Sequence, residues 1–448
     1  MPDEVVSLRK RAFVEAMKKA ALEESQLSLS SCIEKGKNPL LERCVLKEGR
    51  FYDDPQLVFV LSGGGVKGAF YVGFLKELRR QGITPDLVVG TSAGGLAAIA
   101  HGLGMSAEEM EELMGPEVVA KMKSPLRVLW ALIKGKLRGV IDPTPVAKIF
   151  EREAAKRGIY TVGQLHNSVA TAVLRSKTDV VLFGNSNGTK LSPEVPVGVA
   201  AASTMAVPGA VLPPVLRNRV VHILDRFLKA KFFGFERSIK QFHVHKDMCL
   251  DGGVLQNLPL ETATTIVNET TERGAVFVAV NLGYTGHLCR YPGKRFFHTV
   301  KEIWKREKLG MAMLKTLKEI VKRPKELIED ICTNNMVRLG VDALEIAAYS
   351  SLIPSLMTTP YPVLLVNANY DESLSEIGIF QEDSWDMLVE RGEKAARNML
   401  ARLGMGEKDD ETLKRAEKAL IKKQRKSVFA RNNLFQEPDI SAANTLTV

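Results

Sequence analysis

A serine lies in the pattern Gly90-Thr91-Ser92-Ala93-Gly94, which is typical of a nucleophile elbow. The pattern follows a short apolar run and precedes a run of small residues, as expected for a strand that turns directly into a helix. The glycines are needed because the serine of such a turn has a strained backbone, and side chains beside it would collide with the neighbouring strand or helix. The helix N-terminus also favours negative charge that develops nearby. Ser92 is therefore the candidate nucleophile.

A candidate base follows much later in the chain, in Asp251-Gly252-Gly253, with Asn257 and Pro259 beyond it. A hydrolase of the triad type would carry a histidine after the serine, held by an acidic residue. None of the seven histidines lies in a glycine-rich turn, and each is better explained as a surface or packing residue; they are His101, His166, His222, His243, His245, His287 and His298. Asp251 stands out instead as an acidic residue presented on a turn after the short apolar run Met248 to Leu250, although an Asp-Gly pair is also common in ordinary turns.

A glycine-rich loop, Ser62 to Gly68, follows the apolar run Leu57 to Leu61 and opens a helical pattern. Three of its glycines match the dinucleotide fingerprint G-x-G-x-x-G, in which backbone N–H groups approach a pyrophosphate; they are Gly63, Gly65 and Gly68. That fingerprint also requires an acidic residue at the end of the second strand. Here Asp86 precedes the second strand and the strand ends in Gly90, so the nucleotide-binding alternative lacks its confirming context.

Together the three motifs resemble those of the patatin-like phospholipase family. The likeness rests on the loop Gly63 to Gly68, on Gly90 to Gly94, and on Asp251-Gly252-Gly253 with Asn257 and Pro259. Weaker similarities are Ala202 to Gly209 and the helical pattern around Gly392 to Ala396. The resemblance spans about residues 55 to 400. Three motifs in the family's order make it specific.

The resemblance implies a lipid acyl hydrolase that uses a Ser-Asp dyad without a catalytic histidine. Ser92 would be the nucleophile and Asp251 the base, and the oxyanion would be bound by backbone N–H groups of Gly63, Gly64 and Gly65. No metal or organic cofactor is implied. The substrate would be a phospholipid or a lysophospholipid, and the enzyme a phospholipase A or lysophospholipase. Lys67 in the loop would lie near the lipid phosphate or anchor the loop; the alternative is a solvated side chain.

The elements that must position these residues follow from the pattern of apolar residues. Six short apolar runs predict buried strands, over residues 57–61, 87–89, 169–174, 180–183, 275–282 and 363–366. Helical patterns lie between them, notably over residues 69–80 and 385–403. This alternation predicts an α/β fold with a mostly parallel central sheet flanked by helices in three layers, α/β/α. We expect a helical N-terminal extension over residues 1–50, the catalytic domain over 51–404, and a charged helical tail over 405–448.

Charge and composition indicate a folded protein with anionic partners. The 448 residues are 45% hydrophobic and 25% charged, which excludes collagen-like, disordered and low-complexity chains. The formal net charge of +10 favours anionic partners. Two basic, tryptophan-bearing stretches, Lys121 to Arg138 and Lys301 to Lys322, indicate peripheral contact with an anionic membrane, or else ordinary helices packed on the core. We expect no nucleic-acid partner.

The expected location is cytoplasmic or at the membrane periphery. The N-terminus has no apolar signal-peptide run, and the uncharged stretches Leu87 to Ala107 and Val197 to Leu216 are interrupted by glycine or proline, so we expect no transmembrane segment. Bacterial relatives include proteins that are delivered into host cells and wait for a host protein activator. A bacterial origin would therefore imply such a partner and signal-independent secretion. Two further alternatives stay open: a non-catalytic membrane- or partner-binding protein on the same scaffold, and a nucleotide-binding protein that uses the Gly63 to Gly68 loop.

Overall fold

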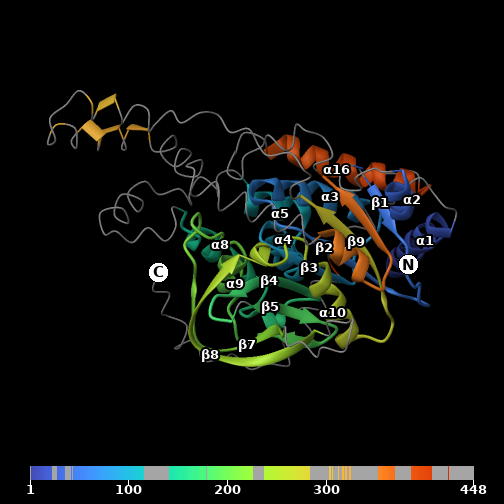
Figure 1. Cartoon of the computed structure of the whole chain (residues 1–448), viewed down its shortest axis with the longest axis horizontal. Helices are drawn as coiled ribbons and strands as arrows, with labels where there is room; N and C mark the ends of the chain where they lie inside the picture. The colour runs from blue at the N-terminus through green and yellow to red at the C-terminus, as the bar shows by residue number, and fades with distance from the viewer. Residues whose placement is uncertain are drawn as a thin grey trace.

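The structure is a computed structural model of the whole chain (Figure 1). It describes residues 2–22, 28–35, 42, 44–115, 141–177, 179–225, 237–282, 352–368 and 385–405, together with single residues between 302 and 323 and residue 422. The basic stretch at 121–138 and nearly all of the expected C-terminal tail lie outside the described residues, as does most of the basic stretch at 301–322.

A ten-stranded sheet connects the described part of the chain, in the order β1-β10-β9-β2-β3-β4-β8-β7-β5-β6. The strands are β1 (Cys44–Lys47), β2 (Gln56–Leu61), β3 (Leu87–Thr91), β4 (Ser168–Leu174), β5 (Asp179–Ser186), β6 (Thr189–Leu191), β7 (Val215–Asp225), β8 (Ser238–Asp251), β9 (Ala275–Asn281) and β10 (Val363–Asn367). All six apolar runs of the sequence fall on strands, namely β2, β3, β4, β5, β9 and β10.

The α/β class is confirmed, but the expectation of a mostly parallel sheet was wrong, because the sheet is mixed. The run β10-β9-β2-β3-β4 is parallel throughout. Beyond it, β4, β8, β7 and β5 pair antiparallel in a closed ring, and β1 and β6 are antiparallel edge strands. The long strands β7 and β8 escaped the search for apolar runs because exposed polar residues interrupt them, as is usual in antiparallel strands with a solvated face.

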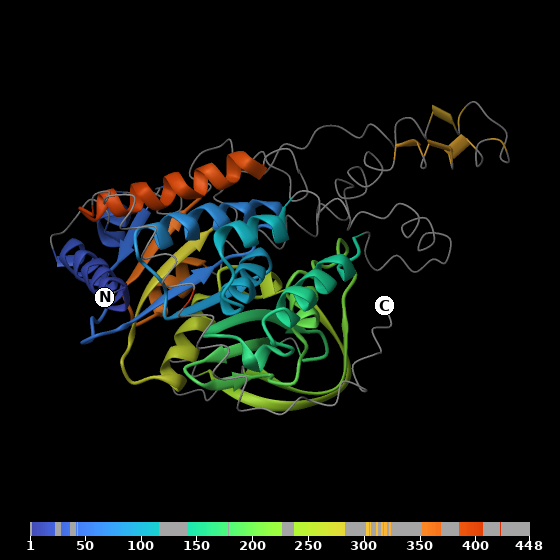
Figure 2. The same cartoon turned by 180° about the vertical axis from the view of Figure 1, so that it is seen from behind.

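Apolar side chains of the parallel strands point to both faces of the sheet, and both faces are buried. In β2, Leu57, Phe59 and Leu61 join one core cluster, whereas Val58 and Val60 join another. Strands β9 and β10 alternate in the same way. Helices cover both sides: α3 (Ala69–Arg80), α4 (Ala93–Gly102) and α16 (Trp385–Arg402) contribute to the first cluster, and α10 (Leu260–Thr270) to the second (Figures 1 and 2).

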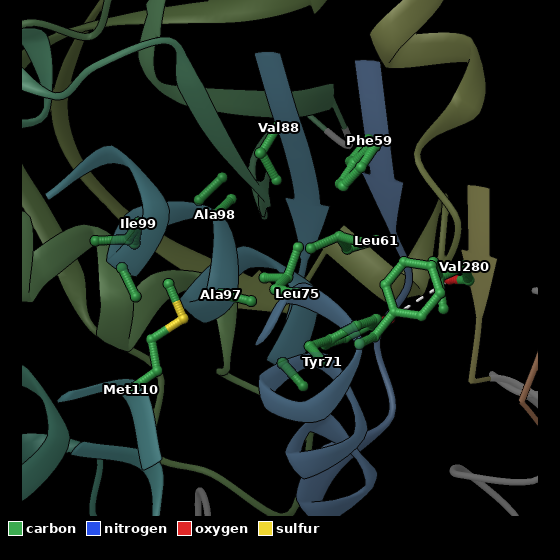
Figure 3. Packing of buried hydrophobic residues seen from close by; sticks show 14 of the residues in the cluster. Phe59, Leu61, Tyr71, Leu75, Val88, Ala97, Ala98, Ile99, Met110 and Val280 are labelled. Atoms are coloured by element: carbon green, nitrogen blue, oxygen red, sulfur yellow. Dashed lines mark hydrogen bonds between the residues drawn. The ribbon is translucent and has the colours of Figure 1, made fainter. Parts of the chain in front are cut away.

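The first cluster joins the two helices that follow the glycine loop and the elbow to the strands that precede them. Figure 3 shows Tyr71 and Leu75 of α3 packed toward Leu61 of β2, with Ala97 of α4 beside them. Helix α16 packs closely against α3, since a methyl group at Gly73 would lie 1.9 Å from the carbonyl oxygen of Val389. The remaining described helices are α1 (Pro2–Leu22), α2 (Leu29–Glu34), α5 (Ala107–Met114), α8 (Thr144–Ala155) and α9 (Val197–Thr204), with the short 3-10 helices η2 (Gly65–Gly68), η3 (Val162–Gln164) and η4 (Gly252–Val254).

The N-terminal segment packs on this core and adds a strand to it. Phe13 and Met17 of α1 are fully buried in the first cluster, and Lys10 forms an ion pair with Asp86 at the start of the strand that leads to the elbow. Strand β1 pairs with β10, so residues 1–50 are not only helical. The domain boundaries near residues 50 and 405 stay predictions. None of the helices in the described ranges is both long enough and apolar enough to cross a bilayer.

Candidate functional site

The candidate nucleophile lies at the turn between β3 and α4. Ser92 has φ 54° and ψ −122°, a positive φ that side-chain-bearing residues rarely adopt, and it is buried. A methyl group at Gly90 would lie 2.0 Å from the carbonyl oxygen of Gly94, and one at Gly94 would lie 2.3 Å from that of Leu61. Both glycines are therefore sterically required, and they allow a strand, a strained turn and a helix to succeed one another without an intervening loop.

We expect Ser92→Gly to be more stable than Ser92→Ala. Both changes remove the hydroxyl, but only glycine adopts the observed φ of 54° without a steric cost of about 1–3 kcal/mol. The greater backbone entropy of glycine in the unfolded chain offsets about 0.4–1 kcal/mol of this gain. Thermal unfolding of the two variants measures the difference. Equal or lower stability of the glycine variant would show that the elbow stores no strain.

The candidate base, Asp251, ends β8, where it pairs with Ala172 of β4. Its carboxylate is buried, and its Oδ1 accepts a hydrogen bond from the N–H of Gly253 at 3.1 Å. Burial raises the pKa of Asp251 from 3.8 to about 7, although hydrogen bonds from the Ser92 hydroxyl and from the Gly253 N–H lower it in part. The Ser92 hydroxyl is thus close enough to act on the pKa of Asp251, while Oδ2 has no hydrogen-bond partner of good geometry within the described part of the chain. Ser92 and Asp251 are thus brought together, and the carboxyl can exchange a proton near neutral pH.

The glycine loop lies directly against the elbow. A methyl group at Gly63 would lie 3.0 Å from Cβ of Ser92 and 2.5 Å from Oδ1 of Asn257. The N–H of Gly63 donates to the backbone oxygen of Asn257 at 3.0 Å, so this donor is already used. Within the described residues, the N–H groups of Gly64 and Gly65 form no hydrogen bond. These two groups are accordingly the donors that the loop can offer to a ligand.

The side chain of Lys67, in η2, is largely buried, with 6% of its surface exposed. Its ammonium group forms no hydrogen bond or ion pair with any residue that the structure describes. A cation beside the glycine loop, with no anionic partner among the described residues, suits a negatively charged ligand group.

Four of the five described histidines have other contacts. Nδ1 of His101 lies 3.3 Å from Nη2 of Arg79, and Nδ1 of His222 accepts from the N–H of Ser192 at 2.9 Å. The rings of His243 and His245 contact each other on the exposed side of β8. His287 and His298 lie outside the described residues. In the parts of the chain that the structure describes, no group of three or more His, Cys, Asp or Glu side chains is arranged to hold a metal ion.

The site also contains threonines that the sequence did not single out as functional. Thr204, the last residue of α9, accepts a hydrogen bond from the N–H of Ser92 at 3.0 Å and donates to the backbone oxygen of Thr171 at 2.7 Å. The hydroxyls of Thr91 and Thr171 lie 2.6 Å apart. The only sequence signal was the position of Thr204 inside the segment Ala202 to Gly209, which resembles the family pattern.

Comparison with known proteins places these residues in a family. Residues 59–264 match the family model of patatin-like phospholipase. A patatin-like phospholipase domain-containing protein of Caenorhabditis elegans is 38% identical over 71 residues, which are 16% of this chain and 5% of that protein.

Two solved structures were also matched. Human GIVD cytosolic phospholipase A2 aligns with a TM-score of 0.37 and 10% identity, covering 93% of this chain and 64% of that chain. The same human enzyme in complex with methyl gamma-linolenyl fluorophosphonate aligns with a TM-score of 0.34 and 12% identity, covering 94% and 64%. This chain thus spans less than two thirds of the length of the human protein, and only a small part of the nematode protein is matched. The family that the sequence motifs indicated is confirmed over the segment that holds the glycine loop, the elbow and Asp251: residues 59–264 of this chain are a patatin-like phospholipase domain.

Proposed function

We propose that this protein is a lipid acyl hydrolase that cleaves fatty-acyl esters of phospholipids or lysophospholipids through an acyl-Ser92 intermediate. The observation that carries the proposal is the pairing of a strained, buried serine with a buried aspartate whose pKa is raised to about 7. A general base is most effective when its pKa lies near the working pH. An aspartate with its ordinary pKa of 3.8 would be a much weaker base for a hydroxyl.

In the proposed reaction, the Asp251 carboxylate takes the proton from Ser92 Oγ while that oxygen attacks the ester carbonyl carbon. The tetrahedral intermediate collapses with cleavage of the bond to the alcohol or lysolipid, which leaves with the proton from Asp251. Water then attacks the acyl-serine, and Asp251 accepts its proton and returns it to Ser92 Oγ as the fatty acid departs. No group beyond ester, water and these two side chains is needed to balance these steps.

The N–H groups of Gly64 and Gly65 are the proposed oxyanion donors. Gly63 was expected to be a third, but its N–H is occupied by the Asn257 backbone oxygen. We assign Gly63 instead the role of letting the loop approach Ser92, because a side chain there would meet Asn257 and Cβ of Ser92. Each donor of this kind is worth about 3–4 kcal/mol of transition-state stabilisation. The nucleotide-binding alternative gains no support, since two N–H groups of the loop are already used: that of Gly63 donates to the backbone oxygen of Asn257, and that of Lys67 to the backbone oxygen of Gly64.

Lys67 supports a phosphate-bearing substrate. We expect Lys67→Gln to lower kcat/KM for a phospholipid about tenfold and to change that for an uncharged soluble ester by much less, because a charged hydrogen bond is worth about 1.5–3 kcal/mol. Lys67→Arg, which keeps the charge, is the matched control and should retain more activity toward the phospholipid. Equal losses on both substrates would mean that Lys67 anchors the loop and does not meet the phosphate.

The proposed function is tested by fatty-acid release from mixed liposomes and by labelling with a fluorophosphonate. The wild type should release fatty acid and be labelled at Ser92, whereas Ser92→Ala should do neither. Ser176→Ala is the control, because this serine is exposed and bonded to Asp247, outside the candidate site. A folded wild type that binds vesicles but neither releases fatty acid nor reacts with the probe would favour the non-catalytic alternative. The assay should include a eukaryotic lysate as a second arm, since a host protein activator is the partner expected if the protein is a bacterial effector.

We also propose peripheral contact with anionic membranes, which is supported by the net charge of +10. Binding to anionic vesicles should then weaken with added salt, since the Debye length falls to about 8 Å at physiological ionic strength.

A further inference from the structure

One short segment contacts the backbones of both proposed catalytic residues. The hydroxyl of Thr204 accepts the N–H of Ser92 at 3.0 Å, and two residues later the carbonyl oxygen of Ala206 accepts the N–H of Asp251 at 2.8 Å. Thr204 and Ala206 are both fully buried, so neither contact is exposed to solvent. This segment belongs to neither the elbow nor the Asp-Gly-Gly turn. It therefore connects two residues, Ser92 and Asp251, that are 159 positions apart in the sequence.

The hydrogen bond to Ser92 has a fixed direction. A hydroxyl has one proton, and that of Thr204 is directed to the carbonyl oxygen of Thr171 at 2.7 Å. Its lone pairs are therefore available to accept the Ser92 N–H. Because Thr171 pairs directly with Thr91 in the sheet, this arrangement ties the turn that follows Thr91 to the neighbouring strand.

Ser92 needs such a support, because its positive φ is a sparsely populated conformation. A strained backbone conformation persists only where several contacts of the surrounding structure hold it in place. The Ser92 N–H is buried, and without Thr204 it would have no partner among the described residues, at a cost comparable to a lost hydrogen bond. The close approach is specific, since a methyl group at Gly95 would lie 2.3 Å from Oγ1 of Thr204.

We propose that the segment Thr204 to Ala206 is a positioning element that sets the separation of Ser92 and Asp251, and that the Thr204 hydroxyl is the contact through which it holds Ser92. This rests on the proposed function of the dyad. The segment holds the nucleophile through a side chain and the base through a main-chain oxygen, so only the first contact can be removed by substitution. Because Oδ2 of Asp251 has no hydrogen-bond partner of good geometry among the described residues, the dyad is sensitive to small displacements, and a misplacement of about 1 Å can cost about a hundredfold in rate.

The test compares Thr204→Val with Thr204→Ser. Valine keeps the shape and removes the hydroxyl, whereas serine keeps the hydroxyl. With an uncharged soluble ester, Thr204→Val should lower kcat about tenfold to a hundredfold with little change in KM, and Thr204→Ser should stay within about threefold of the wild type. The pH midpoint of kcat/KM should rise in Thr204→Val, because the Ser92 hydroxyl normally lowers the pKa of Asp251.

A matched control separates positioning from stability. Thr265→Val removes another buried threonine hydroxyl, which donates to the carbonyl oxygen of Glu261 within α10, and should leave kcat and the pH midpoint of the folded enzyme unchanged. The proposal is overturned if Thr204→Val retains kcat within threefold, if Thr204→Ser loses as much as Thr204→Val, or if the control behaves like Thr204→Val.

Hydrogen exchange gives a readout that does not depend on hydrolysis. Exchange of the backbone amides around Ser92 should accelerate in Thr204→Val and not in Thr204→Ser or Thr265→Val. If the wild type hydrolyses no ester but this pattern appears, the proposed function fails while the contact to the elbow holds. If exchange is unchanged by all three substitutions, Thr204 does not fix the elbow, whatever the activity.

Discussion

Ser92→Ala and Asp251→Asn should each lower ester hydrolysis by about a thousandfold or more, and the double variant should be little worse than either single one. Residues that act as one unit are strongly non-additive, because the loss of either member removes the same step. Of the described histidines, His101 and His222 are bonded elsewhere and the rings of His243 and His245 contact each other, so none of these four is expected to take over that step. Some residual rate over water should survive, supplied by substrate binding and the oxyanion donors.

The measurement is kcat/KM on a soluble ester for wild type, both single variants and the double variant, with folding checked by thermal unfolding. Asp247→Asn is the control for Asp251→Asn, because Asp247 lies on the same strand but accepts hydrogen bonds from Ser176 and Met248. A fully additive double variant would show that the two residues act independently. Activity that survives Asp251→Asn but is lost on changing one histidine to alanine would replace the dyad by a triad.

The sequence predicted those parts of the fold in which the pattern is local and apolar. Buried parallel strands are nearly continuous apolar runs, so β2 and β9 could be located without a structure. Strands β7 and β8 could not, because their burial depends on closure into a ring with β4 and β5, and the residues exposed along them break the apolar pattern. Edge strand β1 was assigned to a helical extension for a similar reason, since four residues carry little periodicity.

The candidate site divides in the same way. Ser92 and Asp251 could be proposed from the sequence because their turns require glycines, and these glycines stand at neighbouring positions in the chain. The role of Thr204 could not be predicted, because it arises where α9 meets the elbow, 112 positions from Ser92. Likewise, only the structure shows that Asn257 occupies the N–H of Gly63. The raised pKa of Asp251 comes from burial, which a sequence pattern does not report.

Activity should rise with pH through a midpoint of about 7, because Asp251 must be deprotonated to act as the base and its pKa is about 7. The plot of kcat/KM against pH reports this pKa in the free enzyme. An uncharged soluble ester avoids any titration of the substrate itself. A midpoint near the ordinary value of 3.8 would mean that the carboxylate is solvated in the working enzyme and that its burial does not tune the base.

The same raised pKa should make Asp251 costly for stability at high pH. Between pH 3.8 and about 7 the folded protein retains a proton on Asp251 that the unfolded chain has released. Stability is lost wherever the folded state binds more protons, so this residue lowers the free energy of unfolding as pH rises through that window, and the loss is complete above about 7. At 1.36 kcal/mol per pKa unit, the full effect is on the order of 4 kcal/mol. Asp251→Asn, although expected to lose most of its activity, should therefore be the more stable protein at pH 8.

Denaturant unfolding of wild type and Asp251→Asn at a series of pH values from about 4 to 8 measures this effect. The stability of the variant relative to the wild type should grow steadily across the series and level off above the Asp251 pKa. Asp247→Asn is the control, because Asp247 lies on the same strand, is partly exposed and is outside the candidate site. If the difference between Asp251→Asn and wild type is the same at every pH, the carboxyl has an ordinary pKa in the folded protein, and the chemical basis for a histidine-free dyad is lost.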